Sequence, residues 1–582
     1  MKPKILSITN PLCAAIFVAV AVISSTQAQT TLGVGDIQVL GVTADANDSF
    51  TFVLWKDIAT NTVIRFMDQS FTNATVGVLG TENDMSLTFT SAASAGSVIR
   101  VEDVVTTVLP SGVTATKAGT LSGISASGDQ VFVYQGTAIG SGTDFTGRTA
   151  LYGFNIADTT FLTTGTADSN KSYLPTSLSG QDASLDSGNF DNADYTGTRT
   201  GLTTGLYRAA AANITNFTQN DTRFALSTTQ FTIASSASIH WDANGTTAGD
   251  GGTGAWDTTT QDRFKNGAAG TTYLHWVNST SDNDHTAVFG GTAGTVSIAA
   301  AGVTASGLTF DVTGYTIQSN TLTLAGNTPT VSVTTAAHSA TISSTLAGST
   351  GLTKSGAGTL NITGTNSANI GATSVTAGTL NVGVSGTGSL TSAVTVTNAG
   401  STLGGSGTVT GNVVVNTGAI LAPGNSPGVM TVVGTTTLDA GSIFSWELNS
   451  DVNHDGVAPE GTRGTNYDGL TTSNLTVASN AIFRVVLTGT ASSDLSTGFW
   501  DQTQTWDNIF TVSGTTSNAA SGHLFDKFEV YNGTTNITLA SASEGSFIMN
   551  GSTLTWSAVP EPTSALAGLL ITAGLLRRRR SA

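Results

Sequence analysis

The chain contains very little of the chemistry on which most enzymes and metal proteins depend. Of 582 residues, one is cysteine and six are histidine. Cys13 lies in an apolar stretch near the N-terminus, so the rest of the chain can form no disulfide and no thiolate metal site. Residues 29–235 contain neither histidine nor cysteine. This excludes Ser-His-Asp and Cys-His catalysis within that segment.

Charged side chains are also scarce, at 10% of the sequence against about a quarter in typical proteins. The chain has 38 acidic and 21 basic residues, and its formal net charge of −17 predicts that it binds no nucleic acid. Across residues 301–440 the charged side chains are Asp311, Lys354 and Asp439, with one histidine, His338. Sugar hydrolysis usually needs two carboxylates about 5–10 Å apart. This segment is therefore predicted to be non-catalytic.

The sequence is instead rich in glycine, threonine and alternating β-branched residues, a pattern that predicts an all-β fold. In residues 29–235, runs such as 50–55 and 130–134 alternate large apolar groups and are separated by turn formers. Short strands joined by turns predict an N-terminal β-sandwich. Asp45, Asp48 and Asp129 lie in the turn-rich stretches and are predicted to cap backbone N–H groups.

A repeat defines the middle of the chain, residues 236–448. The hexapeptide at 357–362, Ala-Gly-Thr-Leu-Asn-Ile, recurs at 377–382 with valine last, and looser copies follow at 399–403, 418–421 and 440–444. A period of roughly twenty residues is typical of one turn of a β-helix. We predict a right-handed parallel β-helix, with Leu, Ile and Val pointing inward and Thr, Ser and Asn pointing outward.

Two phrases in this segment resemble a known family. GLTKSGAGTL with VTAGTLNV, at 351–382, and LAPGNSPGVMTVVGTTTLDAGS, at 421–442, are similar to the autotransporter-associated β-strand repeat. The resemblance implies a secreted solenoid of the kind that autotransporter passengers form. It is carried over to residues 236–448 only.

Residues 449–558 are predicted to form a C-terminal β domain, with strand-like runs at 483–487 and 528–531. Asp451, Asn453 and Asp455 match the first half of a calcium loop, with glycine at the sixth position. Position twelve is Thr462 rather than an acid, so Glu460 or Asp468 would have to replace it. Two interpretations stay open. The loop binds a structural calcium ion, which is the candidate cofactor, or it is a polar turn.

A second cluster of interest combines histidine with tryptophan. His240, His275 and His285 lie near Trp241, Trp256 and Trp276. A zinc site or a sugar-stacking platform could use such residues, but their spacing matches no zinc pattern. Packing at strand ends is the alternative.

Both ends of the chain carry targeting patterns. Residues 1–28 predict a signal peptide, with Lys2 and Lys4, an apolar stretch at 14–23 followed by small residues, and a cleavage site at 26–28. At the other end, the apolar run 565–576 is predicted to form a transmembrane-like helix of about 18 Å, too short to span a bilayer core of about 30 Å. The basic stop after it consists of Arg577, Arg578, Arg579 and Arg580.

Residues 559–582 resemble the PEP-CTERM sorting signal of Gram-negative bacteria, with Pro560, Glu561 and Pro562 as the motif. The resemblance implies that an exosortase in the membrane recognises the chain and cuts it near the motif. Contact with the membrane would then be transient.

Together these patterns predict an exported, non-enzymatic structural protein of the cell surface or extracellular matrix in a Gram-negative bacterium. Its expected partners are an exosortase and an exopolysaccharide. One alternative is a carbohydrate-binding adhesin that uses exposed aromatic rings in the N-terminal domain or in residues 240–276. The other alternative is a glycan-active enzyme.

Overall fold

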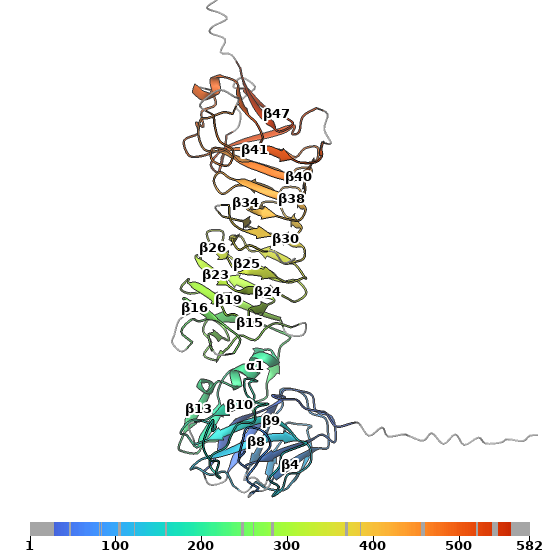
Figure 1. The fold of residues 1–582 in the computed structure, drawn as a ribbon, viewed down its shortest axis with the longest axis vertical. Coiled ribbons are helices and arrows are strands. Elements are labelled where there is room, and N and C mark those ends of the chain that lie inside the picture. The colour runs from blue at the N-terminus through green and yellow to red at the C-terminus, as the bar shows by residue number, and fades with distance from the viewer. Residues whose placement is uncertain are drawn as a thin grey trace, which may run out of the picture.

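The computed structural model describes residues 28–559 except 46–47, 81, 83, 103–105, 122, 158–159, 246–249, 260, 281–283, 367–369, 385, 455–459, 497, 519–521 and 538–544. Figure 1 shows an elongated molecule, with a rounded N-terminal domain at one end, a long stack of strands, and a broader C-terminal end. Nearly all regular structure is β, as the sequence predicts.

The N-terminal domain consists of two six-stranded sheets. The first contains, in order, β13 (Phe217–Asn220), β11 (Asn192–Tyr195), β1 (Ile37–Thr43), β2 (Ser49–Leu54), β5 (Val98–Glu102) and β6 (Thr106–Val108). The second contains β10 (Ser184–Asp186), β9 (Thr149–Ile156), β8 (Asp129–Gln135), β3 (Val63–Met67), β4 (Asp84–Phe89) and β7 (Ala115–Ala118). All pairs are antiparallel except β9 with β10.

Aromatic rings join the two sheets into a sandwich. Phe50 and Phe52 on β2 lie 5.0 and 4.9 Å from the ring of Phe66 on β3 of the other sheet. Since all three side chains are fully buried, the alternating apolar runs of the sequence form the shared core. The predicted capping role of Asp129 is confirmed, because its carboxylate accepts hydrogen bonds from the N–H groups of Ser125 and Gln130.

From residue 236 onward most neighbouring strands pair in parallel; the exceptions in the largest sheet are two short strands, 264–265 and 273–274, which pair antiparallel. The largest sheet has sixteen strands. They are β18 (Tyr273–Leu274), β17 (Phe264–Lys265), β15 (Ser236–Trp241), β19 (Asp284–Phe289), β22 (Gly307–Phe310), β25 (Thr330–Val333), β28 (Leu352–Ser355), β30 (Thr373–Val375), β33 (Val394–Val396), β36 (Val413–Val415), β38 (Val429–Leu438), β35 (Thr408–Val409), β32 (Ser389–Leu390), β40 (Gly469–Val477), β43 (Phe510–Val512) and β44 (Thr516–Asn518).

A second sheet of twelve strands and a third of three run beside it. The second contains β16 (Gly254–Trp256), β20 (Thr295–Ile298), β23 (Tyr315–Ser319), β26 (Ser339–Ile342), β29 (Thr359–Ile362), β31 (Thr379–Val382), β34 (Thr402–Gly405), β37 (Ile420–Pro423), β39 (Ile443–Leu448), β41 (Ile482–Leu487), β45 (Lys527–Asn532) and β46 (Thr535–Asn536). The third contains β21 (Val303–Ala305), β24 (Thr321–Leu324) and β27 (Thr345–Ala347). Because successive strands alternate between sheets and pair with strands one turn away, this part of the chain is a parallel solenoid.

The sequence repeats are stacked in register. Leu360 pairs with Leu380, which pairs with Leu403, and the same row continues through Leu421 to Phe444. All five side chains are fully buried. Between them, Asn381 donates a 3.0 Å hydrogen bond to Asn361 on the preceding turn. The inward Leu and outward Asn positions are thus the ones that the repeat predicts.

The parallel pairing continues past residue 448. β39 pairs with β41 and β41 with β45, while β38 pairs with β40 along eight residue pairs. Partners in these last turns are about forty residues apart rather than about twenty, because longer loops separate the strands. The final turns of the solenoid therefore belong to the segment for which the sequence predicts a separate β domain.

A small antiparallel sheet packs at the end of the solenoid. It contains β42 (Gln504–Trp506), β48 (Thr553–Ala558) and β47 (Gly545–Asn550). Trp500 in the 3-10 helix η2 (Gly498–Asp501) packs edge-on against Trp556, with ring centres 5.4 Å apart. Closing a solenoid end in this way hides strand edges that would otherwise pair with other chains.

The joint between the N-terminal domain and the solenoid is built from several direct contacts. It involves α1 (Thr204–Ala211), η1 (Ile214–Asn216) and the two-stranded pair β12 (Thr200–Leu202) with β14 (Thr232–Ile233). Asn216 makes reciprocal hydrogen bonds with the backbone of Tyr273, of 2.7 and 3.0 Å.

No helix within the described residues has the length and apolar character needed to cross a membrane. The apolar run predicted near the C-terminus lies outside that part of the chain.

Candidate functional site

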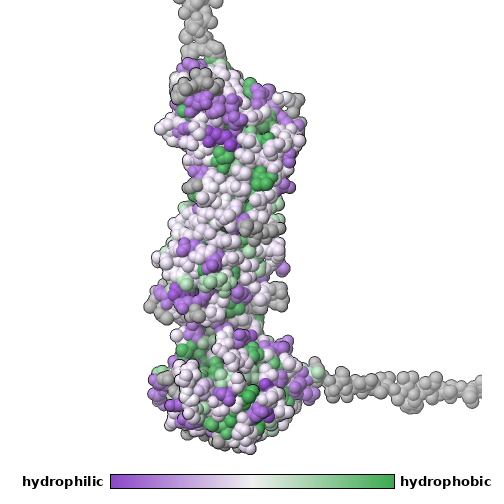
Figure 2. Space-filling model, viewed as in Figure 1, coloured by the Kyte–Doolittle hydropathy of each residue, from purple (hydrophilic) through white to green (hydrophobic). Residues whose placement is uncertain are grey.

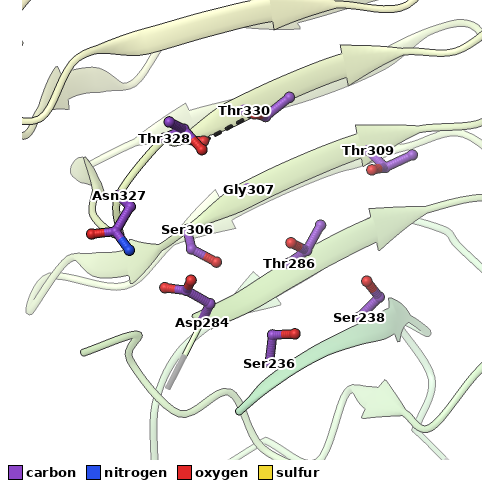
Figure 3. Close-up of a pocket in the computed structure, with 11 residues that line it drawn as sticks. Ser236, Ser238, Asp284, Thr286, Ser306, Gly307, Thr309, Asn327, Thr328 and Thr330 are labelled. Atoms are coloured by element: carbon purple, nitrogen blue, oxygen red, sulfur yellow. Dashed lines mark hydrogen bonds between the residues drawn. The ribbon is translucent and has the colours of Figure 1, made fainter. Parts of the chain in front are cut away.

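A recess, or groove, on the described surface lies on the outer face of the largest sheet of the solenoid. It crosses β15, β19, β22 and β25 and has a volume of about 530 Å³ (Figure 3). Its lining is almost entirely hydroxyl, amide and backbone: Ser236, Ser238, Asp284, Thr286, Ser306, Gly307, Thr309, Gly326, Asn327, Thr328 and Thr330. The lining includes one carboxylate, no cationic side chain and no aromatic ring.

The groove exists because one side chain is missing from a regular row. On the outer face of the sheet, Ser238, Thr286, Gly307, Thr330, Thr353, Ser374 and Thr395 lie in register on successive strands. Gly307 is the one member of this row without a side chain. A Cβ there would lie 2.9 Å from Thr286 Oγ1 and 3.1 Å from Thr330 O, so a side chain at this position would be crowded by the two neighbouring strands.

Asp284 provides the groove's charge. Its Oδ1 atom is shielded from solvent and has no hydrogen-bond partner among the described residues. A Cβ at Gly326 would lie 2.8 Å from that oxygen, so glycine at this position lets the chain pack closely against the carboxylate. In Figure 3, Asp284 lies beside Ser306 and close to Asn327 at one end of the groove.

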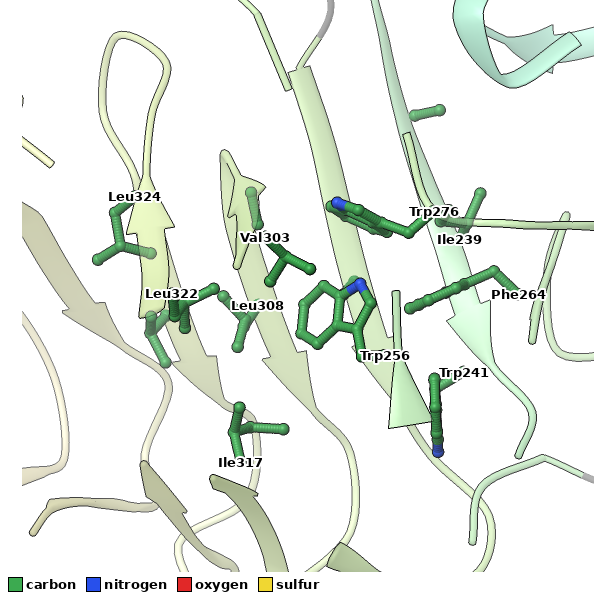
Figure 4. Close-up of a cluster of buried hydrophobic side chains, with 14 of the residues drawn as sticks. Ile239, Trp241, Trp256, Phe264, Trp276, Val303, Leu308, Ile317, Leu322 and Leu324 are labelled. Atoms are coloured by element: carbon green, nitrogen blue, oxygen red, sulfur yellow. The ribbon is translucent and has the colours of Figure 1, made fainter. Parts of the chain in front are cut away.

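The tryptophans proposed as a sugar-stacking platform are not available for that role. Trp241, Trp256 and Trp276 are fully buried and fill the interior of the first solenoid turns (Figure 4). The rings of Trp256 and Trp276 meet edge to face, with centres 5.0 Å apart. All eight tryptophans of the chain are in fact buried: Trp55 lies in the N-terminal domain, and the other seven lie toward the two ends of the solenoid.

The three histidines near these tryptophans have separate structural roles. His285 is fully buried; Nδ1 lies 2.7 Å from Val277 O, and Nε2 lies 2.7 Å from Thr203 Oγ1 at the start of α1. Since a carbonyl oxygen only accepts, Nδ1 carries the proton and Nε2 accepts from the threonine. Burial lowers the pKa of His285, which keeps the imidazole neutral.

His275 lies in the joint between two carboxylates. Its Nε2 is 3.2 Å from Asp182 of the N-terminal domain, and its Nδ1 is 3.5 Å from Asp262 of the solenoid. Burial alone would lower the pKa of His275, but the hydrogen bonds and charges of the two acids outweigh it and raise the pKa to about 9. His275 is thus a cation that links the two parts of the molecule.

A further buried ion cluster closes the first turn of the solenoid. Lys265 is 3% exposed, and its ammonium lies 2.7 Å from Asp250 and 3.7 Å from Asp242. Tyr273 donates a hydrogen bond to Asp242 from its hydroxyl. The lysine ammonium therefore occupies the position between two carboxylates that a bound cation would take.

The sequence suggested a calcium loop, and the structure describes part of it. Asp451 accepts a 2.6 Å hydrogen bond from the N–H of Ser492, and Asn453 donates one of 3.0 Å to Gln504. Asp455 lies outside the described residues. Asp468 is 3% exposed and accepts hydrogen bonds from the N–H groups of Gly428 and Glu447, which ties it to another segment. Where side chains are described, no group of three or more His, Cys, Asp or Glu residues is arranged to hold a metal ion.

The other predicted site residues fall beyond the region that the structure describes. These are the sorting motif Pro560, Glu561 and Pro562, the basic stop Arg577, Arg578, Arg579 and Arg580, and residues 1–27 of the signal peptide. Their roles stay predictions.

Three groups have displaced pKa values that the sequence did not indicate. Burial, together with the charge of Asp68, raises the pKa of Glu82 to about 7, and burial raises that of Asp129 to about 8. In the solenoid, burial lowers the pKa of Lys354 to about 8. The Lys354 ammonium is fully buried and donates to the carbonyl oxygens of Ser355, Gly356 and Ala377 at 2.8, 2.9 and 3.0 Å. These contacts are those of structural groups that satisfy buried backbone.

Comparison with known proteins places the chain near one named adhesin. No protein-family model matches the chain. The adhesin BmaC autotransporter of Brucella suis biovar 1 (strain 1330) is 34% identical over 329 residues, which is 53% of this chain. The match spans 9% of that relative's length, so the chain corresponds to a small part of it.

Proposed function

We propose that this chain is an exported, non-enzymatic, adhesin-like protein of the cell surface or extracellular matrix of a Gram-negative bacterium. The observation that carries the proposal is the unbroken parallel solenoid, joined by direct contacts to a globular domain. The similarity to a protein named as an autotransporter adhesin supports the same class. The solenoid would wind to the right, as is typical of parallel strand connections.

In this proposal the solenoid is a stalk. From β15 to β43 the main sheet crosses about ten strand spacings, so at roughly 4.8 Å each the stalk is about 50 Å long. Every turn is hydrogen-bonded to the turns before and after it, which makes bending costly. On the face shown in Figure 2, the stalk is mostly of intermediate hydropathy, and strongly hydrophilic residues gather near the C-terminal end, with a smaller group near the base of the stalk. Such a surface suits a spacer that stays soluble without binding charged molecules.

The absence of catalysis is also part of the proposal. The groove has a single carboxylate, and the buried histidines at the joint are held by neighbouring side chains and backbone. These arrangements favour architecture over acid–base chemistry. A glycan-active enzyme would instead release reducing ends from a polysaccharide, and a reducing-sugar assay with purified protein over a range of pH tests this directly.

Export and processing complete the proposal. Residues 1–28 would direct secretion, and an exosortase would cut near Pro560, Glu561 and Pro562 after the basic stop holds the chain transiently in the membrane. Intact-mass measurement of the protein from cells with and without the exosortase tests this step. A product ending near Pro562 supports it, whereas a mature chain that keeps Arg577–Ala582 contradicts it.

Placement at the surface is tested separately. Antibodies against residues 29–235 should label intact cells or the surrounding matrix, and cells that lack the protein should attach less to surfaces or to one another. Labelling that requires permeabilised cells would contradict the proposal.

The predicted calcium site is proposed to have a structural role. Removing calcium with a chelator would then lower the thermal stability of residues 449–558 without affecting the N-terminal domain.

A further inference from the structure

The groove that crosses β15, β19, β22 and β25 is lined by hydroxyl, amide and carboxylate side chains. Such a lining is typical of a binding site. A row of stacked threonines and serines would normally be continuous, as it is from Thr330 through Thr395. Here the row is interrupted at Gly307, and the loop beside it also carries a glycine, at Gly326, where φ is +98°. Two glycines on different turns thus line the same groove.

The polar groups around the groove are largely unused. Within the described part of the chain, the side chains of Thr286, Thr309 and Asn327 make no hydrogen bond to protein, although each can donate and accept. Thr330 donates to Thr328 O, and Ser306 donates to His285 O. A ligand in the groove would therefore meet free hydroxyl and amide groups at several neighbouring positions.

Asp284 is the strongest acceptor among these groups. Its Oδ1 atom is removed from solvent and lacks a protein donor. The other carboxylate oxygen, Oδ2, is neither buried nor hydrogen-bonded to protein within the described residues, so it is the atom that a donor in the groove can reach. Because no cationic side chain lines the groove, a ligand with its own negative charge would be repelled.

The shape of the groove indicates an extended ligand. It crosses four adjacent strands, which at roughly 4.8 Å spacing is about 14 Å along the axis of the stalk. A short linear molecule with many hydroxyl groups fits these dimensions and this lining. No aromatic ring is present for stacking, so recognition would rest on hydrogen bonds alone.

We propose that this groove binds a segment of a neutral glycan, with Asp284 accepting hydrogen bonds from sugar hydroxyls and Gly307 providing the space for a sugar ring. The site goes beyond the adhesin-like function proposed above and does not rest on export or processing. It also differs from the aromatic platform considered from the sequence, because none of its residues is aromatic.

The test uses purified protein of residues 29–559 and two sets of oligosaccharides of four to six sugars. One set contains neutral hexoses and N-acetylhexosamines, and the other contains hexuronic acids. Binding is measured by saturation-transfer NMR and by titration. We expect at least one neutral oligosaccharide to bind with a Kd of about 0.1–1 mM, as suits a shallow site without stacking, and uronic acid oligosaccharides to bind at least about tenfold more weakly.

Two variants and two matched controls locate the binding. Gly307→Ser refills the row and Asp284→Asn removes the charge at almost constant volume; each should weaken binding about tenfold, the cost of losing space or one charge-assisted hydrogen bond. Ser374→Thr changes the same row outside the groove, and Asp311→Asn removes an exposed acid after β22. Both controls should bind as the unmodified protein does, and all four variants should keep its melting temperature within a few degrees.

Several outcomes would overturn the proposal. These are the absence of binding by every neutral oligosaccharide at about 10 mM, stronger binding of the uronic acid set, or unchanged binding by both Gly307→Ser and Asp284→Asn. If Gly307→Ser unfolds because of its close contact with Thr330 O, the Asp284→Asn result decides alone.

Discussion

At the joint between the N-terminal domain and the stalk, one protonated histidine connects two carboxylates that belong to different parts of the molecule. His275 has a raised folded-state pKa of about 9, compared with about 6.5 for an unhindered imidazole. A histidine with a raised pKa stabilises the fold fully below its unfolded value, and this stabilisation is lost as the pH rises through the folded value. The joint should therefore weaken under alkaline conditions.

We expect His275→Gln to lower the free energy of unfolding by about 1–3 kcal/mol at pH 6, and by much less at pH 10. The comparison is made by denaturant unfolding of both proteins across that range. His338→Gln, which changes a histidine in the solenoid away from the joint, serves as the control for removing an imidazole elsewhere. A constant difference between unmodified protein and His275→Gln from pH 6 to pH 10 would show that the imidazole is not the charged link.

Lys354 illustrates a different use of a buried charge. Its ammonium occupies an inward position between Val331 and Val375 and satisfies three backbone carbonyls at a corner of the solenoid. We expect Lys354→Met to lower stability by about 2 kcal/mol, because an apolar side chain fills the space but leaves the carbonyl oxygens without donors. Lys527→Met, on the exposed edge of β45, should have an effect within about 0.5 kcal/mol. Equal effects of the two substitutions in thermal unfolding would contradict the structural role of Lys354.

Neither His275 nor Lys354 could be assigned these partners from the sequence. Asp182 lies far along the chain from His275, and the joint that brings them together depends on how the two parts dock. The Lys354 partners include Ala377, which is adjacent only because the solenoid places successive turns side by side. For the calcium motif, the local sequence spacing indicated a site that the tertiary contacts do not complete. Asp468, one of the acids proposed to complete it, accepts hydrogen bonds from the N–H groups of Gly428 and Glu447 instead.

Among the elements, the repeated strands were the most predictable. The sequence placed Leu360, Leu380, Leu403, Leu421 and Phe444 at equivalent positions, and the structure pairs them in one continuous inward row. This success has a physical basis, because each turn presents the same inward position to a neighbour with the same pattern. Beyond residue 448 the repeat length roughly doubles, so periodicity no longer marks the turns although the strands continue to pair.

This continuation predicts how a shortened chain behaves. A protein ending at residue 448 would expose the edges of β38 and β39, which otherwise pair with β40 and β41. We expect it to form oligomers or aggregate, since an uncovered strand edge is a template for other chains. A protein ending at residue 559 should be monomeric under the same conditions. Size-exclusion chromatography with light scattering distinguishes them, and a well-folded monomer of 28–448 would favour a separate C-terminal domain.

The groove was not predictable as an element of the fold. It depends on Gly307 lying opposite Thr286 and Thr330 on neighbouring turns, and on Gly326 lying close to Asp284. The glycines in this segment look alike in the sequence, and most serve corners. Only the strand register distinguishes the one that interrupts a row of outward hydroxyls. The tryptophans at 241–276 show the reverse case. The sequence suggested that they form a sugar-binding platform, but in the structure they are buried in the interior of the first turns.

At the scale of the whole molecule, the N-terminal sandwich, the joint and the solenoid form a single elongated body (Figure 1). Contacts across the joint come from several elements, including Asn216 with Tyr273, Thr203 with His285, and Asp182 with His275. An adhesin-like stalk requires this rigidity, because a flexible joint would let the N-terminal domain fold back toward the surface that carries it. The low charge of the solenoid is compatible with the same role, since it limits non-specific attraction to other molecules.

The measurement that tests this account most directly is electron microscopy of single purified molecules of residues 29–559. We predict one rod with a larger rounded end, and a constant angle between the two in nearly all particles, with the same result at pH 6 and pH 8. Compact globules, or two bodies whose angle varies widely from particle to particle, would contradict the rigid stalk on which the proposed function depends.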